Sequence, residues 1–539
     1  MLGKRKALVA AILMWSMSAL VLASDIPKLV VKDGRHALLV AGAPYLILGA
    51  QINNSSSWPA VLAQVWPALE AMHANTAEAP IYWEQLEPQP GKFDYTTVDM
   101  LVTQAREHHL HLVLLWFGTW KNGQDHYVPE WVKQDTTKYP RVIRENGQPI
   151  DVLSANARAN LEADKAAFVA LMRHVKAIDG EQHTVLLIQV ENESGNIGSV
   201  RDFSSMAQKQ FAEQVPADLV RAFKKQPGTW AQVFPGEADE YFQAYYQSRY
   251  VNEIAEAGKA EYPLPMYINV WLSYPPAELP ERRMPVPGIQ YPSGGAVTRM
   301  IDLWKFNAPA IDMIGPDIYS DDSGFYNSQL DAYGRPDNPL WIPETGSGDS
   351  FAKFFFTALG KGAIGFSPFG IDNTGWTFAL AEGSKPANGP KSHTENYELL
   401  EPMDRLIANL NFEGKLKAAV EEVGQAGQEI DLGGWQATVR FGFPQADGRR
   451  PPGTKDLQGR VLMGQLGPDE FLVTGFDASV SFHSPGELPG QRSQILRAEE
   501  GHYENSEWKP IRILNGDQTD RGLIFRGKPT IVKIKMGKF

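Results

Sequence analysis

Two apolar segments of the chain end in glutamates. In LIQVENE at 187–193, residues typical of a buried strand are followed by Glu191 and Glu193, and PLWIPE at 339–344 ends in Glu344. A carboxylate buried beside apolar residues costs free energy unless it is hydrogen-bonded or used in chemistry. Two such carboxylates brought together would suit cleavage of a glycosidic bond. One protonates the leaving oxygen, and the other attacks or stabilises the anomeric carbon.

Eight short β-type runs, each followed by room for a helix, surround these glutamates in the sequence. They lie at 45–52, 76–83, 111–118, 184–191, 265–272, 311–319, 339–344 and 363–370. This count predicts a closed (β/α)₈ barrel rather than an open doubly wound sheet, which would place a glycine-rich loop after its first strand. Strands four and seven then face each other across the barrel, so their terminal side chains can converge.

Side chains alternate along a strand, so Glu191 and Glu193 are expected to share one orientation and Asn192 to take the other. Which of them faces the pocket depends on where the strand ends and the backbone turns.

The chain divides into three expected parts. Residues 1–24, with Lys4, Arg5 and Lys6 before an apolar run, are typical of a secretory signal peptide, with an N-terminal membrane anchor as the alternative. Residues 25–411 form the barrel, and the alternating runs of 412–539 predict an antiparallel, sandwich-like β-domain. We therefore expect export to a bacterial periplasm or the extracellular space.

The composition narrows the class of partner. The formal net charge of −12 argues against nucleic acid and anionic membranes, and suits a neutral substrate. The chain has no cysteine and therefore no disulfide. No later stretch is apolar enough to cross a bilayer. The histidines form no metal-binding motif, so neither a metal nor a cofactor is expected. The oligomeric state stays open.

Three motifs carry a family resemblance: VENESG, PETGSG and YWEQLEPQPGKFDY (82–95). Over roughly residues 30–400 the chain resembles the β-galactosidases of glycoside hydrolase family 35, in their bacterial branch with a short C-terminal β-domain. It departs from them at Ser194 and at Thr345 and Gly346, where family members often carry aromatic residues. These departures leave the chemistry intact and the identity of the sugar open.

The resemblance implies roles for three residues. Glu193 becomes the general acid/base, Glu344 the nucleophile, and Asn192 a hydrogen-bond partner of the sugar's 2-hydroxyl. The chemistry agrees, because Glu193 must hold a proton near neutral pH while Glu344 must stay ionised.

Five further residues are candidates for substrate binding, each with a structural alternative. Tyr82 reaches the sugar or closes the barrel top. Trp116 and Trp120 stack on sugar faces or, in the case of Trp116, pack in the core. Tyr319 touches Glu344 or the sugar, and Glu191 either supports the site from below or contacts the sugar. Weaker candidates at strand ends are Gln51, Asn53 and Asp317.

The leading hypothesis is a retaining exo-β-galactosidase that removes terminal β-galactosyl residues from plant-type oligosaccharides or polysaccharides. The resemblance suggests the side chains of xyloglucan. The rivals are another retaining β-glycosidase of the same clan, such as a β-glucosidase or exo-glucosaminidase, and a non-catalytic carbohydrate-binding barrel.

Overall fold

A computed structural model describes residues 25–274, 285–374 and 390–539, apart from gaps at 426, 442–443, 446–447, 450–457, 486–490, 505 and 527–528. The expected signal segment, residues 1–24, and part of the connection after the fifth predicted strand lie outside the described residues. Within the described part, no helix has the length and apolar character needed to cross a bilayer.

All eight predicted strands pair in parallel and close into a barrel, which confirms the expected fold. In barrel order they are β4 (Ile47–Gln51), β5 (Thr76–Tyr82), β6 (His111–Phe117), β9 (Val185–Val190), β10 (Met266–Trp271), β11 (Met313–Ile318), β12 (Ile342–Thr345) and β13 (Gly365–Pro368). Their residues are almost all buried because helices cover the outer face and side chains fill the interior. This is why they read as continuous apolar runs rather than as alternating ones.

The helices follow the strands in the order that a (β/α)₈ barrel requires. The longer ones are α1 (Leu62–Ala71), α3 (Thr96–Glu107), α5 (Arg158–Asp179), α9 (Ala238–Glu261), α10 (Ile301–Asn307), α11 (Ser323–Tyr333), α12 (Ala352–Gly360), α13 (Lys391–Leu400) and α14 (Asp404–Phe412). Short helices stand in the loops: α2 (Trp83–Leu86), α4 (Glu130–Gln134), α6 (Ser205–Ala212), α7 (Ala217–Ala222) and α8 (Trp230–Val233).

Two small sheets complete the barrel domain. The antiparallel strands β1 (Lys28–Lys32), β2 (Arg35–Val40) and β3 (Ala43–Tyr45) precede the barrel, and β7 (Arg141–Ile143) pairs with β8 (Pro149–Leu153) in the loop after β6. Leu38 and Val40 of β2 belong to the same apolar cluster as Val113 and Leu187 inside the barrel. The first sheet therefore closes the N-terminal end of the barrel, which leaves the C-terminal end for the site.

The C-terminal part consists of two antiparallel sheets with an apolar core between them. One sheet has the order β14 (Leu416–Val420), β19 (Arg460–Gly467), β20 (Glu470–Phe476), β25 (Thr530–Lys538), β22 (Ser493–Glu504) and β23 (Glu507–Ile513). The other has the order β15 (Gly427–Asp431), β16 (Gln436–Phe441), β21 (Ala478–His483) and β24 (Leu523–Phe525). A two-residue pair, β17 (Pro444–Gln445) and β18 (Gly448–Arg449), stands apart.

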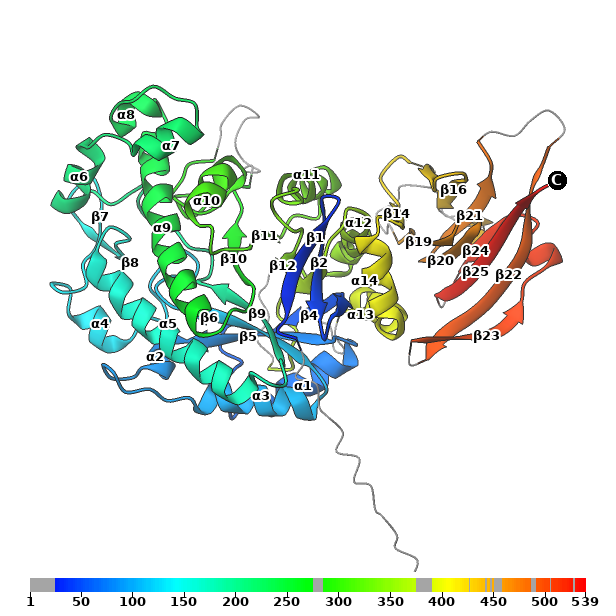
Figure 1. Cartoon of the computed structure of the whole chain (residues 1–539), viewed down its shortest axis with the longest axis horizontal. Helices are drawn as coiled ribbons and strands as arrows, with labels where there is room; N and C mark the ends of the chain where they lie inside the picture. Colours follow the sequence, from blue (N-terminus) through cyan, green and yellow to red (C-terminus); the bar gives the residue numbers. More distant parts are fainter. Residues whose placement is uncertain are drawn as a thin grey trace, which may run out of the picture.

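The β-domain lies beside the barrel next to α12, α13 and α14 (Figure 1). Phe356 of α12 meets Phe476 of β20 edge to face, with ring centroids 6.1 Å apart. Trp435 lies in the core of the β-domain, whereas Tyr503 is buried in the apolar cluster of the barrel and Trp508 packs against that cluster.

Candidate active site

Glu344 stands at the end of β12 and accepts a hydrogen bond on each carboxylate oxygen. Tyr319 donates to Oε1 at 2.5 Å, and the Gln51 amide donates to Oε2 at 2.9 Å. Burial and the charge of Glu344 raise the pKa of Tyr319, so its hydroxyl keeps the proton that it donates. The Glu344 anion is therefore held in one orientation by residues at the ends of β11 and β4, as a nucleophile requires.

Glu193 follows β9 and lies close to Glu344. One carboxylate oxygen from each of Glu193, Glu344 and Asp317 lies within 4.8 Å of the others. This upper bound is compatible with the roughly 5–5.5 Å between the carboxyl groups of retaining glycosidases and lies below the roughly 6.5–9.5 Å of inverting ones. Burial, followed by the charge of Glu344, raises the pKa of Glu193 to about 7. Glu193 can therefore hold a proton near neutral pH and release it.

The backbone after β9 corrects the expected orientation of the two strand-four glutamates. β9 ends at Val190, and both Glu191 (φ +65°) and Glu193 (φ +45°) adopt left-handed conformations. Alternation therefore stops before Glu191, so the two side chains do not share a face. Glu193 lines the cavity at the barrel mouth, whereas Glu191 contacts Asp164 of α5.

Asn269 connects Glu193 to the third carboxyl. It accepts from the Glu193 backbone N–H at 2.8 Å, and its amide donates to Asp317 Oδ2 at 2.7 Å. Burial, together with the charges of Glu344 and Glu193, raises the pKa of Asp317 well above its usual range. Asp317 is thus a neutral acid inside the site, a role that the sequence left undecided.

Those three carboxyls, on Glu193, Glu344 and Asp317, are the one cluster of potential metal ligands found among the described residues. Protonated acids are poor metal ligands because a ligating carboxylate must be ionised. The arrangement fits proton transfer better than metal binding.

A cavity of about 320 Å³ opens on the glutamates. Its lining residues are Asn54, Lys121, Asn122, Glu193, Trp271, Tyr274, Asp317, Tyr319, Glu344 and Phe369. Lys121 is the cation among them, only 4% exposed, and its ammonium group lies 5.1 Å from the centre of the Phe117 ring. Sequence reasoning missed Lys121, Asn122, Asn54, Trp271, Tyr274 and Phe369. All six end a barrel strand or follow one closely, and this position is the signal that could have found them.

Asn192 is fully buried, and neither its Oδ1 nor its Nδ2 has a hydrogen-bond partner among the described residues. A buried amide without partners is costly, but Asn192 does not line the cavity, so its hydrogen bond to a substrate hydroxyl stays a prediction. Tyr82 is also buried, but it accepts from the Ser57 N–H at 3.2 Å and does not line the cavity. Its contact with the sugar stays a prediction.

Trp116 and Trp120 are fully buried, and neither lines the cavity. Trp116 donates its indole N–H to Asp164 at 2.8 Å, and the Trp120 ring meets Tyr250 at 4.7 Å. The backbone N–H of Trp120 donates to Glu191 Oε2 at 2.8 Å. These three predicted binding residues therefore lie behind the site rather than at its surface.

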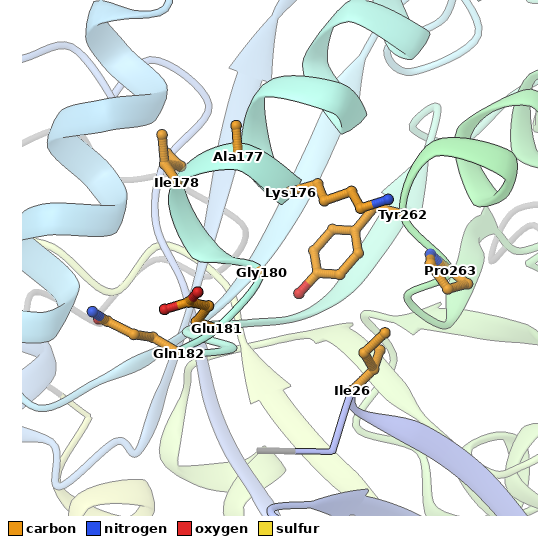
Figure 2. Close-up of a pocket in the computed structure, with 9 residues that line it drawn as sticks. All are labelled: Ile26, Lys176, Ala177, Ile178, Gly180, Glu181, Gln182, Tyr262 and Pro263. Atoms are coloured by element: carbon orange, nitrogen blue, oxygen red, sulfur yellow. The ribbon is translucent and has the colours of Figure 1, made fainter. Parts of the chain in front are cut away.

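A second hollow, of about 560 Å³, lies at the opposite end of the barrel (Figure 2). Its lining comes from the end of α5, from Glu181 and Gln182 before β9, from Tyr262 and Pro263 before β10, and from Ile26. It has a single carboxylate and lies at the end that barrel enzymes do not use for catalysis. The smaller cavity is therefore the candidate active site.

Comparisons with known proteins agree with this geometry. Residues 57–259 match the model of glycoside hydrolase family 42, described as beta-galactosidase, and residues 393–526 match a domain of unknown function (DUF5597). No curated protein sequence matches significantly. Together with the site geometry, the first match supports a glycoside hydrolase built on a (β/α)₈ barrel. Assignment to family 35, which the motifs led us to expect, is not supported, because the matching model is that of family 42.

A solved β-galactosidase shares the fold. The enzyme from Bacillus circulans sp. alkalophilus aligns with a TM-score of 0.51 and 11% identity, covering 91% of this chain and 99% of that one. The cold-adapted enzyme from Rahnella sp. R3 aligns with a TM-score of 0.47 and 17% identity, covering 70% of this chain and 59% of that one. At these identities the likeness concerns the fold alone. The chain covers 59% of the Rahnella enzyme and 62% of the one from Marinomonas ef1.

Proposed function

We propose that the protein is a retaining exo-β-galactosidase that works by double displacement through Glu193 and Glu344. The observation that carries the proposal is the placement of these two carboxyls, with oxygens within 4.8 Å of each other in one buried cavity. The match to the beta-galactosidase family model supports the choice of sugar.

In the first step, Glu344 attacks the anomeric carbon while Glu193 gives its proton to the glycosidic oxygen. The bond to the aglycone breaks, the aglycone leaves as an alcohol, and the sugar becomes an ester of Glu344. Asn192, whose side-chain amide has no partner among the described residues, donates to the 2-hydroxyl.

In the second step, Glu193, now ionised, takes a proton from water, and the oxygen of that water attacks the anomeric carbon. The ester breaks and Glu344 returns as the anion. Esterification has removed the Glu344 charge that raises the pKa of Glu193, so that pKa falls in the intermediate. A lower pKa suits the Glu193 carboxylate that this step begins with.

The size of the cavity favours action on a terminal sugar. At about 320 Å³ it lies at the small end of the roughly 300–1,000 Å³ range of ligand pockets. We propose terminal β-galactosyl units of plant-type saccharides as substrates, and galactosylated xyloglucan oligosaccharides as the first to test. The apolar run within residues 1–24 makes export part of this proposal.

The deciding experiment replaces Glu344 by Gly and supplies azide with an activated aryl β-galactoside. Azide should enter the space left by the nucleophile and yield an α-galactosyl azide of inverted configuration. The matched control is Glu193→Ala, which keeps the nucleophile and should yield the β-azide of retained configuration. Absence of the α-azide from the Glu344 variant would remove Glu344 as the nucleophile.

A panel of chromogenic β-glycosides tests the sugar separately. We expect the β-galactoside to be hydrolysed with the highest kcat/KM. Faster turnover of the β-glucoside or the β-glucosaminide would favour the other retaining glycosidases of the clan, and no turnover of any glycoside would favour a non-catalytic binding protein.

A further inference from the structure

Glu191 and Asp164 form a buried pair of carboxyls behind the active site. Glu191 is 1% exposed and Asp164 is fully buried, and their side chains are close enough to interact. A Cβ atom added at Gly118 would lie 2.8 Å from Glu191 Oε1 and 2.9 Å from Asp164 Oδ1. Both oxygens therefore border the same space beside Gly118, together with the Trp116 indole nitrogen, and only glycine at 118 leaves room for them.

The pair has no balancing cation. In the described part of the chain, neither Glu191 nor Asp164 forms an ion pair, and the strongest charge acting on Glu191 is that of Asp164. Two carboxylates in contact away from water cannot both be ionised, so one of them must hold a proton. Burial and the neighbouring acid raise the pKa of Glu191 well above its usual range.

The hydrogen-bond donors show which acid holds the proton. Asp164 accepts from the Trp116 indole at 2.8 Å, from the Thr119 N–H at 3.0 Å and from the Thr119 hydroxyl at 2.6 Å. Glu191 accepts from the Trp120 N–H at 2.8 Å on Oε2, with a smaller effect of the Thr119 N–H, and no donor among the described residues reaches its Oε1. Donors stabilise the ionised form, so Asp164 is the anion and Glu191 the acid.

We propose that Glu191 is a protonated positioning residue, which donates to Asp164, accepts from the Trp120 backbone and so fixes the turn that carries Glu193. Trp120 is the link, because its carbonyl also accepts the Asn192 N–H at 3.2 Å. Trp120, which follows β6, is thus hydrogen-bonded to the side chain of the left-handed Glu191 and to the backbone of Asn192. Lys121, next to Trp120, lines the cavity, so the same tie positions the cation of the site.

Among the described residues, one other titratable group lies near Glu191 and Asp164. Tyr250 of α9 shares a hydrogen bond of 2.8 Å with the Thr119 hydroxyl, and burial raises the pKa of Tyr250 well above its usual range. Tyr250 therefore stays neutral, and the proton between Glu191 and Asp164 is the one that can leave at high pH.

Two isosteric variants separate the possible proton positions. In Glu191→Gln the amide N–H can donate to Asp164 while the amide oxygen accepts from Trp120, as in the protonated acid. In Asp164→Asn an NH₂ group replaces one carboxylate oxygen, so the donors of Trp116 and Thr119 lose an acceptor. We expect Glu191→Gln to keep kcat/KM within about threefold of the wild type, whereas Asp164→Asn and Glu191→Leu lose about 100-fold, mainly in kcat, because Glu193 is displaced. The reverse ranking, equal losses, or full activity in all three variants would overturn the proposal.

A second measurement, of melting temperature against pH, does not depend on catalysis. Only the kinetic test of the protonated Glu191 rests on the proposed galactosidase reaction. Above the ordinary glutamate pKa of about 4.3, the unfolded chain has released the Glu191 proton, whereas the folded wild type still holds it. The free energy of unfolding of the wild type therefore decreases as pH rises. The melting temperature of Glu191→Gln should therefore fall less than that of the wild type between about pH 5 and 8. Glu181→Gln, at an exposed glutamate before β9, is the control and should follow the wild type. Parallel curves for Glu191→Gln and the wild type would refute a protonated Glu191 whatever the enzyme hydrolyses.

Discussion

Replacing Glu193 by Gln removes the proton donor while keeping its size. Because the pKa of Glu193 is raised to about 7, half of the wild-type enzyme carries the proton at neutral pH. One pH unit higher, only about a tenth does. The kcat/KM of the wild type should therefore fall about tenfold for each pH unit above this pKa, because kcat/KM reports the ionisation of the free enzyme.

The size of the loss depends on the leaving group. General acid catalysis contributes roughly 10²–10⁴-fold, and an alkyl or sugar aglycone needs all of it because an alkoxide is a poor leaving group. Glu193→Gln should lose that factor on such galactosides, which corresponds to about 3–5 kcal/mol of transition-state stabilisation. An aryl galactoside with an acidic phenol should lose much less in the first step, since the phenolate leaves without a proton.

The assay is kcat/KM against pH for both kinds of substrate. We expect the alkaline limb near pH 7 to vanish in Glu193→Gln and to persist in Asp317→Asn, where only the third carboxyl of the site is changed. The reasoning would be refuted if Glu193→Gln kept the limb and Asp317→Asn abolished it, since Asp317 would then be the acid.

Three further substitutions test separate parts of the structure. Lys121→Met removes the cation that lowers the pKa of Glu193, so that pKa rises and the alkaline limb of kcat/KM should move up by roughly half to one pH unit. Tyr319→Phe removes a hydrogen bond to the charged Glu344, worth about 1.5–3 kcal/mol, so kcat should drop roughly 10–100-fold. Asn338→Ala removes three side-chain hydrogen bonds to the buried backbone of β11 and α11. It should cost about 2–4 kcal/mol of unfolding free energy and lower the melting temperature by roughly 2–5 °C in thermal unfolding.

The barrel could be predicted from the sequence because its strands are buried on both faces. Such strands are short apolar runs with turn residues between them, and the pattern survives without any knowledge of the contacts. The antiparallel strands β22 and β23 are harder to find in the sequence because their outward faces are polar and charged, which hides the apolar alternation.

The two glutamates could be predicted because a carboxylate at the end of an apolar run is costly unless it has a use. The environment of Glu191 could not be predicted, since two non-glycine residues turn left-handed after Val190 and end the alternation. That conformation depends on the ties to Trp120 and Asn269, which come from distant segments.

The protonation states of the site follow from its charges taken together. Glu344 is an anion held by two donors, and Lys121 is the cation that lines the same cavity. If Glu193 and Asp317 were also ionised, three negative charges within 4.8 Å would face one positive charge away from water. Protons on Glu193 and Asp317 leave the cavity neutral, which suits an uncharged sugar. The crowding of carboxyl groups therefore keeps on Glu193 the proton that a glycosidase needs on its acid.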